Sequence, residues 1–198
     1  MADKIRNSLW EEEILQKKGD RRFYTFVFVV LALFFAQFYL SAFVYVNVQV
    51  DGPSMMNTVV DGDVLIANKN LAPDYGDVII IDGVLSDGDW LIKRVIGKGG
   101  DVISLNGDGV VYRNGQPLDE KYARGKTFYE QREIRWVVPD GEIFYLGDNR
   151  ERSGDSRVFG TCKESQIIGV VEQWVIDAKW FFNGYYRVVG KIQGIFGL

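Results

Sequence analysis

Residues 23–46 read FYTFVFVVLALFFAQFYLSAFVYV, a run of 24 residues without one charged side chain. As an α-helix this run would be about 36 Å long at ~1.5 Å per residue, which exceeds the ~30 Å hydrocarbon core of a bilayer. A cleaved signal sequence would have an apolar region of only ~7–15 residues, followed by a small-x-small cleavage site. This run is longer, and no Ala-x-Ala follows it. We therefore expect one transmembrane helix over residues 23–46, with the lipid bilayer as a partner.

The charges that flank this helix predict its orientation. Four basic residues lie between positions 17 and 22, and the first charged residue after the helix is Asp51. Because basic residues are retained on the cytoplasmic side of a membrane, residues 1–22 are expected to form a cytoplasmic segment. Residues 47–198 are then an extracytoplasmic domain of a single-pass protein of the cell membrane.

This second part of the chain contains short apolar runs separated by turn signals. Asp-Gly or Asn-Gly pairs occur six times between the runs, as they do in β-hairpins. The runs are Val64–Ala67, Asp77–Ile81, Trp90–Ile96, Val102–Leu105, Val110–Tyr112, Ile134–Val138, Ile143–Leu146 and Ile168–Ile176. No long stretch with a 3.6-residue period is evident. We expect a mainly β protein, with an antiparallel β-sheet domain that includes a small β insertion around residues 106–140.

The C-terminal stretch from Trp174 to Leu198 is rich in aromatic residues, and three basic residues interrupt it. This composition suits the headgroup region of a membrane. It is equally compatible with a last core strand followed by a frayed tail. Both interpretations stay open at this point.

Two features of the composition limit the chemistry. The chain has no histidine, which excludes a Ser-His-Asp triad, a Cys-His pair and a histidine-ligated metal site within one chain. Cys162 is the single cysteine, so no disulfide forms within the chain. The formal net charge of −4 argues against nucleic acid as the main partner. We expect neither a metal nor a cofactor.

A serine hydrolase without histidine can use a lysine amine as its base. Burial among apolar side chains lowers the pKa of a lysine enough for this role. Only Lys93, in WLIKRVI, and Lys179, in VIDAKWFF, lie in strongly apolar runs. Candidate serines are Ser54, which follows a Gly-Pro pair, and Ser153 or Ser156 in a dense polar loop. These residues alone do not decide between the pairs.

Three segments, in order after the apolar helix, resemble the motifs of bacterial type I signal peptidases. The first is residues 54–58, SMMNT, similar to the nucleophile motif Ser-Met-x-Pro-Thr of that family. The second is residues 93–97, KRVIG, followed by Gly100-Asp101, which matches the lysine motif of the family. The third is residues 147–157, GDNRERSGDSR, which fits the family pattern at every fixed position.

The resemblance implies a membrane-bound serine endopeptidase that removes N-terminal signal peptides from secretory preproteins after small-x-small sites. By position, Ser54 is the nucleophile and Lys93 the general base. Ser153 matches the serine that orients the lysine amine. Asp155 and Arg157 match an ion pair that holds the loop against the catalytic strand.

The resemblance also places the Ser54 backbone N–H in an oxyanion hole, together with the region of Gly52, where some members have a hydrogen-bonding serine. Asn57 departs from the family, because it occupies the usual proline position. Two alternatives are another Ser/Lys peptidase, such as a conjugation-pilin peptidase, and a non-catalytic anchored β domain that binds a partner.

Overall fold

The computed structural model describes residues 2–84, 86, 88–128 and 134–196. These residues form two compact units, residues 1–44 and residues 45–198. The helices are α1 (Ala2–Tyr39), α2 (Ser156–Phe159), α3 (Gln173–Asp177) and α4 (Lys179–Phe196). The strands are β1 (Tyr45–Gln49), β2 (Val64–Asn68), β3 (Val78–Ile81), β4 (Leu91–Lys98), β5 (Val102–Leu105), β6 (Val111–Arg113), β7 (Gln116–Pro117), β8 (Ile134–Val137), β9 (Glu142–Leu146), β10 (Cys162–Lys163) and β11 (Ile167–Val171). A π-helical turn (Leu40–Val44) and a 3-10 turn (Glu164–Gln166) complete the set.

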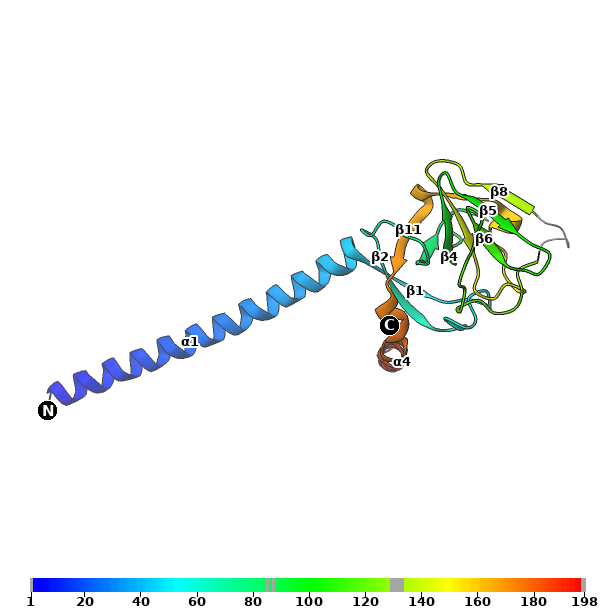
Figure 1. Cartoon of the computed structure of the whole chain (residues 1–198). Helices are drawn as coiled ribbons and strands as arrows, with labels where there is room; N and C mark the ends of the chain where they lie inside the picture. Colours follow the sequence, from blue (N-terminus) through cyan, green and yellow to red (C-terminus); the bar gives the residue numbers. More distant parts are fainter. Residues whose placement is uncertain (1, 85, 87, 129–133, 197–198) are drawn as a thin grey trace. The chain divides into compact units, whose positions relative to one another are not determined.

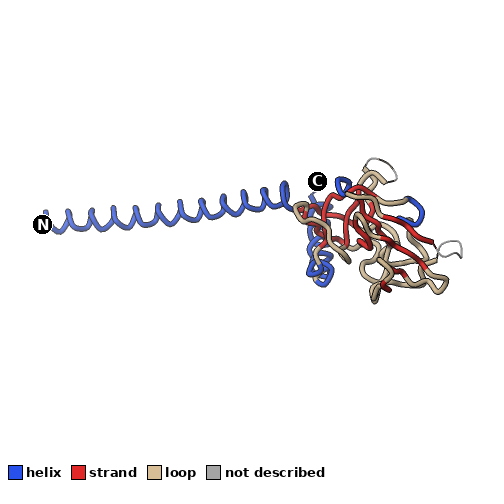
Figure 2. Tube along the Cα trace, turned by 45° about the horizontal axis from the view of Figure 1, so that its top comes forward, coloured by secondary structure: helices blue, strands red, loops and turns tan. Residues whose placement is uncertain are grey.

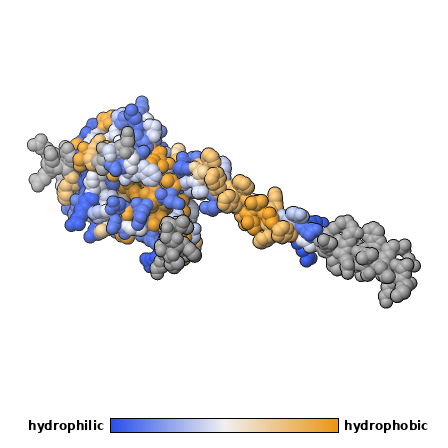
Figure 3. All heavy atoms as spheres, turned by 180° about the vertical axis from the view of Figure 1, so that it is seen from behind, coloured by the Kyte–Doolittle hydropathy of each residue, from blue (hydrophilic) through white to orange (hydrophobic). Residues whose placement is uncertain are grey.

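The first unit is α1 with the π-helical turn that follows it. Its segment Gly19–Val44, 26 residues long, is apolar and long enough to cross a membrane. Figure 3 shows this segment as an apolar band, preceded by hydrophilic residues. The predicted span extended two residues too far, because Tyr45 and Val46 begin β1. Their side chains are half-buried in the β domain, and their backbone pairs with β2.

The second unit is built on a seven-stranded antiparallel sheet with the strand order β1-β2-β11-β3-β4-β9-β10 (Figure 1). Side chains from five strands meet in one apolar core, which includes Val48, Leu65, Val78, Ile92 and Val171. Strands that are far apart in the sheet order contribute to this core, so the sheet curls around it. Tube and ribbon views agree that strands and loops, not helices, form most of this unit (Figure 2). The predicted mainly β, antiparallel fold is therefore confirmed.

A four-stranded antiparallel sheet with the order β7-β6-β5-β8 lies next to the first sheet. Ile103 and Val111 of this sheet share a core with Ile96 of β4 and Phe144 of β9, which joins the two sheets. A tight turn connects β6 to β7, and its two residues, Asn114 and Gly115, have positive φ angles of 52° and 80°, as an Asn-Gly hairpin requires. Residues 106–140 contribute β6, β7 and β8, and their description as an insertion stays a prediction.

The C-terminal end of the chain is helical, which corrects the sequence-based expectation. The apolar run Ile168–Ile176 is a strand only as far as Val171, and α3 and α4 follow it. The alternative of a last strand with a frayed tail was therefore wrong, and the lack of an evident 3.6-residue period gave no indication of α4. Phe182 of α4 packs against the main core, which is how an amphipathic helix gains most of its stability.

Candidate active site

Ser54 lies in the loop between β1 and β2, just after a Gly-Pro pair. Backbone hydrogen bonds between Val50 and Asp63 (2.8 Å) and between Gly62 and Val50 (2.9 Å) close the base of this loop. Within it, the Met56 N–H donates to the Pro53 carbonyl at 3.1 Å, which forms a turn around Ser54. Ser54 is half-buried and lies in this hydrogen-bonded turn, not at an exposed loop tip.

Lys93 lies near the start of β4 and is only 3% exposed. Its Nζ is 3.0 Å from Ser54 Oγ and donates to the Ile92 carbonyl at 2.9 Å. Burial disfavours the ammonium form and lowers the pKa of Lys93 to about 8, although the negative charges of Asp155 and Asp148 oppose this decrease. At pH 7 about one-tenth of such amines are neutral. A neutral amine at this distance can accept the hydroxyl proton of Ser54.

A cleft of about 490 Å³ opens at this pair of residues. Its volume is within the range of ~300–1,000 Å³ that is common for ligand sites. The walls are largely apolar and include Val48, Val50, Trp90, Ile92 and Phe159. Strand β1, which forms one wall, is an edge strand of the large sheet. An extended peptide in the cleft can therefore lie beside a strand edge, an arrangement that proteins use to bind peptides.

Residues 147–157, here named the polar loop, bind the backbone of the Ser54 turn. The backbone N–H of Asn149 donates to the Ser54 carbonyl, and its side-chain amide donates to the Pro53 carbonyl, both at 3.0 Å. Gly147 allows this close approach. A Cβ atom at Gly147 would lie 2.6 Å from the Ser54 carbonyl oxygen and 2.2 Å from Ser153 Oγ. No side chain larger than hydrogen fits there without moving the nucleophile turn.

An ion pair between Asp148 and Arg94 connects the polar loop to β4. Arg94 Nε and Nη2 contact the two carboxylate oxygens of Asp148 at 2.8 and 2.6 Å, and both side chains are buried. The hydroxyl of Thr58, in the Ser54 loop, also donates to this carboxylate. Because Arg94 follows Lys93 directly, the ion pair fixes the strand that carries the lysine and the turn that carries the serine relative to each other.

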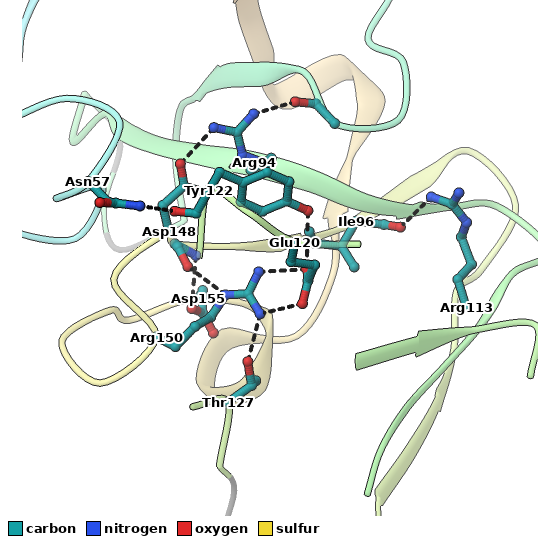
Figure 4. Close-up of polar contacts among 12 residues, drawn as sticks. Asn57, Arg94, Ile96, Arg113, Glu120, Tyr122, Thr127, Asp148, Arg150 and Asp155 are labelled. Carbon is teal, nitrogen blue, oxygen red and sulfur yellow. Dashed lines mark hydrogen bonds and ion pairs between the residues drawn. The ribbon is translucent and has the colours of Figure 1, made fainter. Parts of the chain in front are cut away.

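A second buried cluster surrounds Arg150 (Figure 4). Its guanidinium forms two hydrogen bonds with Glu120, at 2.8 and 2.6 Å, and a third with Thr127 at 2.6 Å. The ring of Tyr122 lies 4.1 Å from the Arg94 guanidinium carbon and so joins the two arginine clusters. The sequence analysis did not identify Glu120, Tyr122 or Thr127. No local sequence pattern predicts a role for these residues, because they lie in an irregular segment and their partners are distant in the sequence.

Asp155 and Arg157 form a buried ion pair with a distance of 2.8 Å. The second carboxylate oxygen of Asp155 accepts the backbone N–H of Gly147 at 3.1 Å. Arg157 donates to the Arg150 carbonyl at 2.8 Å. The pair therefore ties the two ends of the polar loop together.

Two of the predicted supporting contacts are absent from the described residues of this structure. Ser153 Oγ is buried beside Gly147 but has no hydrogen-bond partner, so it does not contact the Lys93 amine. The Gly52 N–H is engaged, because it donates to the Asp61 carboxylate at 2.9 Å. The Gly52 N–H is therefore not a free donor in this structure, and a role of the Gly52 region in an oxyanion hole stays a prediction. By contrast, among residues 2–84, 86, 88–128 and 134–196, no hydrogen bond uses the Ser54 N–H.

The other candidate groups have different environments. Lys179 Nζ donates to the Thr58 carbonyl at 2.6 Å and lies 3.5 Å from Asp63, so its amine is engaged by groups other than the candidate serines. Ser156 donates nothing to a base, and its hydroxyl accepts the Tyr145 N–H at 2.8 Å. Burial raises the pKa of the Cys162 thiol to about 12. Within the described residues, no group of three or more His, Cys, Asp or Glu side chains is arranged to hold a metal ion.

Comparisons with known proteins show to which family this chain belongs. The family model described as "Signal peptidase, peptidase S26" matches residues 21–176. A signal peptidase I of Bacillus caldolyticus is 40% identical over 149 residues, which cover 67% of this chain and 80% of the relative. Signal peptidase IB of Staphylococcus aureus is 30% identical over 162 residues, which cover 72% and 83% respectively.

A solved structure of a signal peptidase I from Enterococcus faecalis aligns with a TM-score of 0.43 and 30% identity, covering 50% of this chain and 97% of that chain. The family match includes the Ser54 turn, β4 with Lys93 and the whole polar loop. This chain belongs to the signal peptidase family, peptidase family S26.

Proposed function

We propose that Ser54 is the nucleophile and Lys93 the general base with which this membrane-associated serine endopeptidase removes signal peptides from secretory preproteins. The observation that carries the proposal is the distance of 3.0 Å between Ser54 Oγ and Lys93 Nζ, with the lysine buried at the cleft. The family supports the reaction class. The lowered pKa of Lys93 supports the assignment of the base.

The reaction proceeds in two steps. In the first, neutral Lys93 takes the hydroxyl proton of Ser54 as the serine oxygen bonds to the scissile carbonyl carbon. The Lys93 ammonium then gives that proton to the departing amine, the C–N bond breaks, and an ester links Ser54 to the signal peptide. In the second step Lys93 takes a proton from water, the water oxygen bonds to the ester carbon, and the proton returns to Ser54 as its C–O bond breaks.

Negative charge develops on the carbonyl oxygen of the substrate in both steps. The Ser54 N–H is unengaged, which supports the proposal that it donates a hydrogen bond to this oxygen. Donors placed in advance at such an oxygen are a large part of the catalysis of acyl transfer. Pro53 has no N–H, and the Gly52 N–H is bound to Asp61. A second donor is therefore expected from a side chain or from the bound substrate.

Ser153 is proposed to orient the Lys93 amine when substrate is bound. A neutral amine has two N–H groups, and Ile92 accepts one of them. Ser153 Oγ is buried, has no partner and lies near the Ser54 carbonyl. We infer that Ser153 accepts the second N–H in the substrate complex, which would leave the lone pair of the amine directed at Ser54. Catalytic hydrogen bonds often form fully only in the complex.

The substrate is proposed to enter the cleft in extended form, with the bond after a small-x-small sequence at Ser54. The cleft borders edge strand β1, and its apolar walls favour short apolar side chains over charged ones. The small-x-small preference itself comes from the resemblance to the family.

The orientation in the membrane is proposed from the flanking charges, with residues 1–22 in the cytoplasm and the β domain outside. A Ser165→Cys variant, whose site is exposed, tests this in intact cells with a membrane-impermeant maleimide. Labelling from outside is expected. Native Cys162 is buried and serves as the internal background. Labelling only after lysis would reverse the assignment.

The function itself is tested with the full chain in detergent and a preprotein that carries an Ala-x-Ala site. The wild type should cleave it at that site, and Ser54→Ala and Lys93→Ala should not. Matched controls are Ser165→Ala and Lys121→Ala, which remove an exposed serine and an exposed lysine far from the cleft lining. Unchanged cleavage by either active-site variant would contradict the proposal, and a wild type that only binds the preprotein would support the non-catalytic alternative.

A further inference from the structure

We propose that the outer face of α4 docks the β domain on the surface of an anionic lipid bilayer, as a second membrane contact besides the apolar segment of α1. This goes beyond the proposed function, since it adds a lipid contact that the chemistry of the dyad does not require. The helix lies beyond residue 176, where the match to the family model ends. The inference comes from four properties of the helix: its exposed apolar face, its charge, its attachment to the β domain and its place in the chain.

The helix has two faces with different partners. Lys179, Phe182 and Asn183 point to the β domain, where Phe182 packs on the core and the other two are hydrogen-bonded. At helical spacing, the opposite face presents Phe181 (56% exposed) and Val188 (57%). An exposed stripe of this kind on a short helix is a mark of an interaction surface.

Aromatic residues dominate the exposed surface of this helix. Trp180 is 73% exposed and Tyr185 is 56% exposed, and Trp174 of the preceding α3 is 51% exposed. Trp and Tyr are enriched where proteins meet the headgroup region, because each has an apolar ring with one polar atom. A protein core would have buried these rings, whereas a bilayer surface can accept both parts of each side chain.

The charge of the helix fits an anionic surface. From Ala178 to Leu198 the sequence contains three basic residues and no acidic residue, although the whole chain has a net charge of −4. Lys179 faces the β domain and lies 3.5 Å from Asp63, so its charge does not belong to the outer face. Arg187 is exposed on the flank of the apolar face. Aromatic and basic residues on one amphipathic helix are typical of helices that lie in the plane of an anionic membrane. A partner protein of ordinary composition would not require this exclusion of acidic side chains.

The attachment of α4 to the β domain uses hydrogen bonds to a strand that lies near the residue following the apolar segment. Asn183 Oδ1 accepts the Val64 N–H at 2.7 Å, and Val64 pairs with Gln49 of β1. Gln49 is four residues from Tyr45, where the β domain begins, which is about 13 Å along the strand at ~3.3 Å per residue. The helix itself is about 27 Å long at ~1.5 Å per residue. The site at which α4 is attached is therefore close along the chain to the residue that follows the apolar segment.

The same contacts connect the helix to the loop that carries the nucleophile. Lys179 binds the Thr58 carbonyl and the Asp63 carboxylate, and Asn183 Nδ2 also binds Asp63 at 2.8 Å. Figure 1 shows α4 next to β1 and β2, the strands that flank this loop. A helix held on the membrane would therefore hold the Ser54 loop at a fixed height above the bilayer, where membrane-bound substrates are cut.

The test uses the full chain with Cys162→Ala and an environment-sensitive fluorophore on Tyr185→Cys, in vesicles of phosphatidylglycerol and phosphatidylcholine. Val188→Cys is a second reporter on the same face. Val137→Cys, 67% exposed on β8, is the matched control. We expect quenching by lipids that carry a shallow nitroxide, and protection from aqueous iodide, at both α4 sites and not at Val137. Replacing the anionic lipid with phosphatidylcholine should weaken both effects.

Arg187→Glu tests the charge, with Arg135→Glu on β8 as its control. The α4 reporters should lose docking about fivefold or more with Arg187→Glu, because one basic residue near an anionic surface contributes roughly that factor. Arg135→Glu should leave them unchanged. Iodide quenching of both α4 reporters equal to that at Val137 in anionic vesicles would overturn the proposal. So would protection that disappears in nanodiscs with one chain each, since the partner would then be a second copy. None of these readouts depends on peptidase activity.

Discussion

Replacing Lys93 with methionine should stabilise the β domain at neutral pH while it abolishes cleavage. The lysine is 3% exposed, and burial lowers its pKa from 10.5 to about 8. Since each pKa unit corresponds to about 1.4 kcal/mol, the folded protein pays about 3 kcal/mol to keep this amine charged below pH 8. Methionine has a similar length and no charge, so Lys93→Met removes this cost.

The pH dependence of the stability difference between Lys93→Met and wild type separates the cost of the buried charge from changes in packing. Below about pH 8 the amine is charged in both the folded and the unfolded protein, and the full cost is present. Between pH 8 and 10.5 the unfolded chain retains a proton that the folded chain has released, so wild-type stability rises with pH. The advantage of Lys93→Met should therefore shrink by about 3 kcal/mol across this window.

Thermal unfolding of the full chain in detergent, followed by tryptophan fluorescence, measures this advantage. A change of about 3 kcal/mol corresponds to roughly 6–12 °C in Tm for a domain of this size. We expect the Tm difference between Lys93→Met and wild type to fall by that amount from pH 7 to pH 10.5. Lys163→Met, at an exposed site, controls for the loss of one positive charge. A difference that is the same at both pH values would refute the reasoning.

Three further predictions concern the groups around the dyad. Gly147→Ala should lower kcat about a hundredfold or more while the domain stays folded, because a Cβ there would lie 2.6 Å from the Ser54 carbonyl oxygen and displace the nucleophile. Arg94→Met should cost about 3–5 kcal/mol in chemical denaturation, because Asp148 would be left buried without its partner. Ser153→Ala should lower kcat about tenfold and shift the acid limb of kcat, because the lysine amine would lose a hydrogen-bond acceptor in the substrate complex.

Each of these variants has a control and a contradicting result. Gly107→Ala adds a Cβ in open space and should leave kcat unchanged; equal effects at the two glycines would refute the steric reasoning. Lys121→Met breaks only an exposed ion pair and should cost less than about 1 kcal/mol. A loss for Arg94→Met as small as that would show that the carboxylate is not buried as described. An unchanged pH profile in Ser153→Ala would show that this serine does not orient the Lys93 amine.

The β-strands were largely predictable because their patterns are local. The run Val102–Leu105 was predicted with its observed bounds, and most others were within two residues. The Asn114-Gly115 pair predicts a hairpin because both residues tolerate the positive φ angles that the turn requires. Strand β1 was not predicted. Tyr45 and Val46 continue the apolar composition of the preceding helix and were assigned to it, and residues 47–49 were not among the predicted strands.

The helix α4 was not predictable from periodicity, because tertiary contacts decide which of its faces is inside. Its inner face includes Lys179 and Asn183, two polar residues that are satisfied only by the loop before β2. Its outer face carries Phe181 and Tyr185, which a helical pattern would assign to a core. A helical pattern would therefore have placed the outer face of α4 against the core.

The candidate site was predictable only in part for the same reason. Local sequence limited the base to two lysines, and the order of the motifs chose Lys93. The polar loop has the composition of a solvated segment, yet Asp148 and Arg150 are buried, because partners from distant segments neutralise them. Glu120, which binds Arg150, lies 30 residues away in an irregular segment, and no short-range signal connects the two.

The measurement that tests the central claim most directly is a comparison of two pKa values of the active full chain. Heteronuclear NMR of the lysine amines, assigned with Lys93→Met, gives the pKa of Lys93. The acid limb of kcat/KM for preprotein cleavage gives the pKa of the catalytic base in the free enzyme. If Lys93 is the base for Ser54, both values should coincide near 8, with cleavage rising as pH increases. A Lys93 amine that titrates near its ordinary value of ~10.4, or an acid limb that does not follow it, would contradict the assignment.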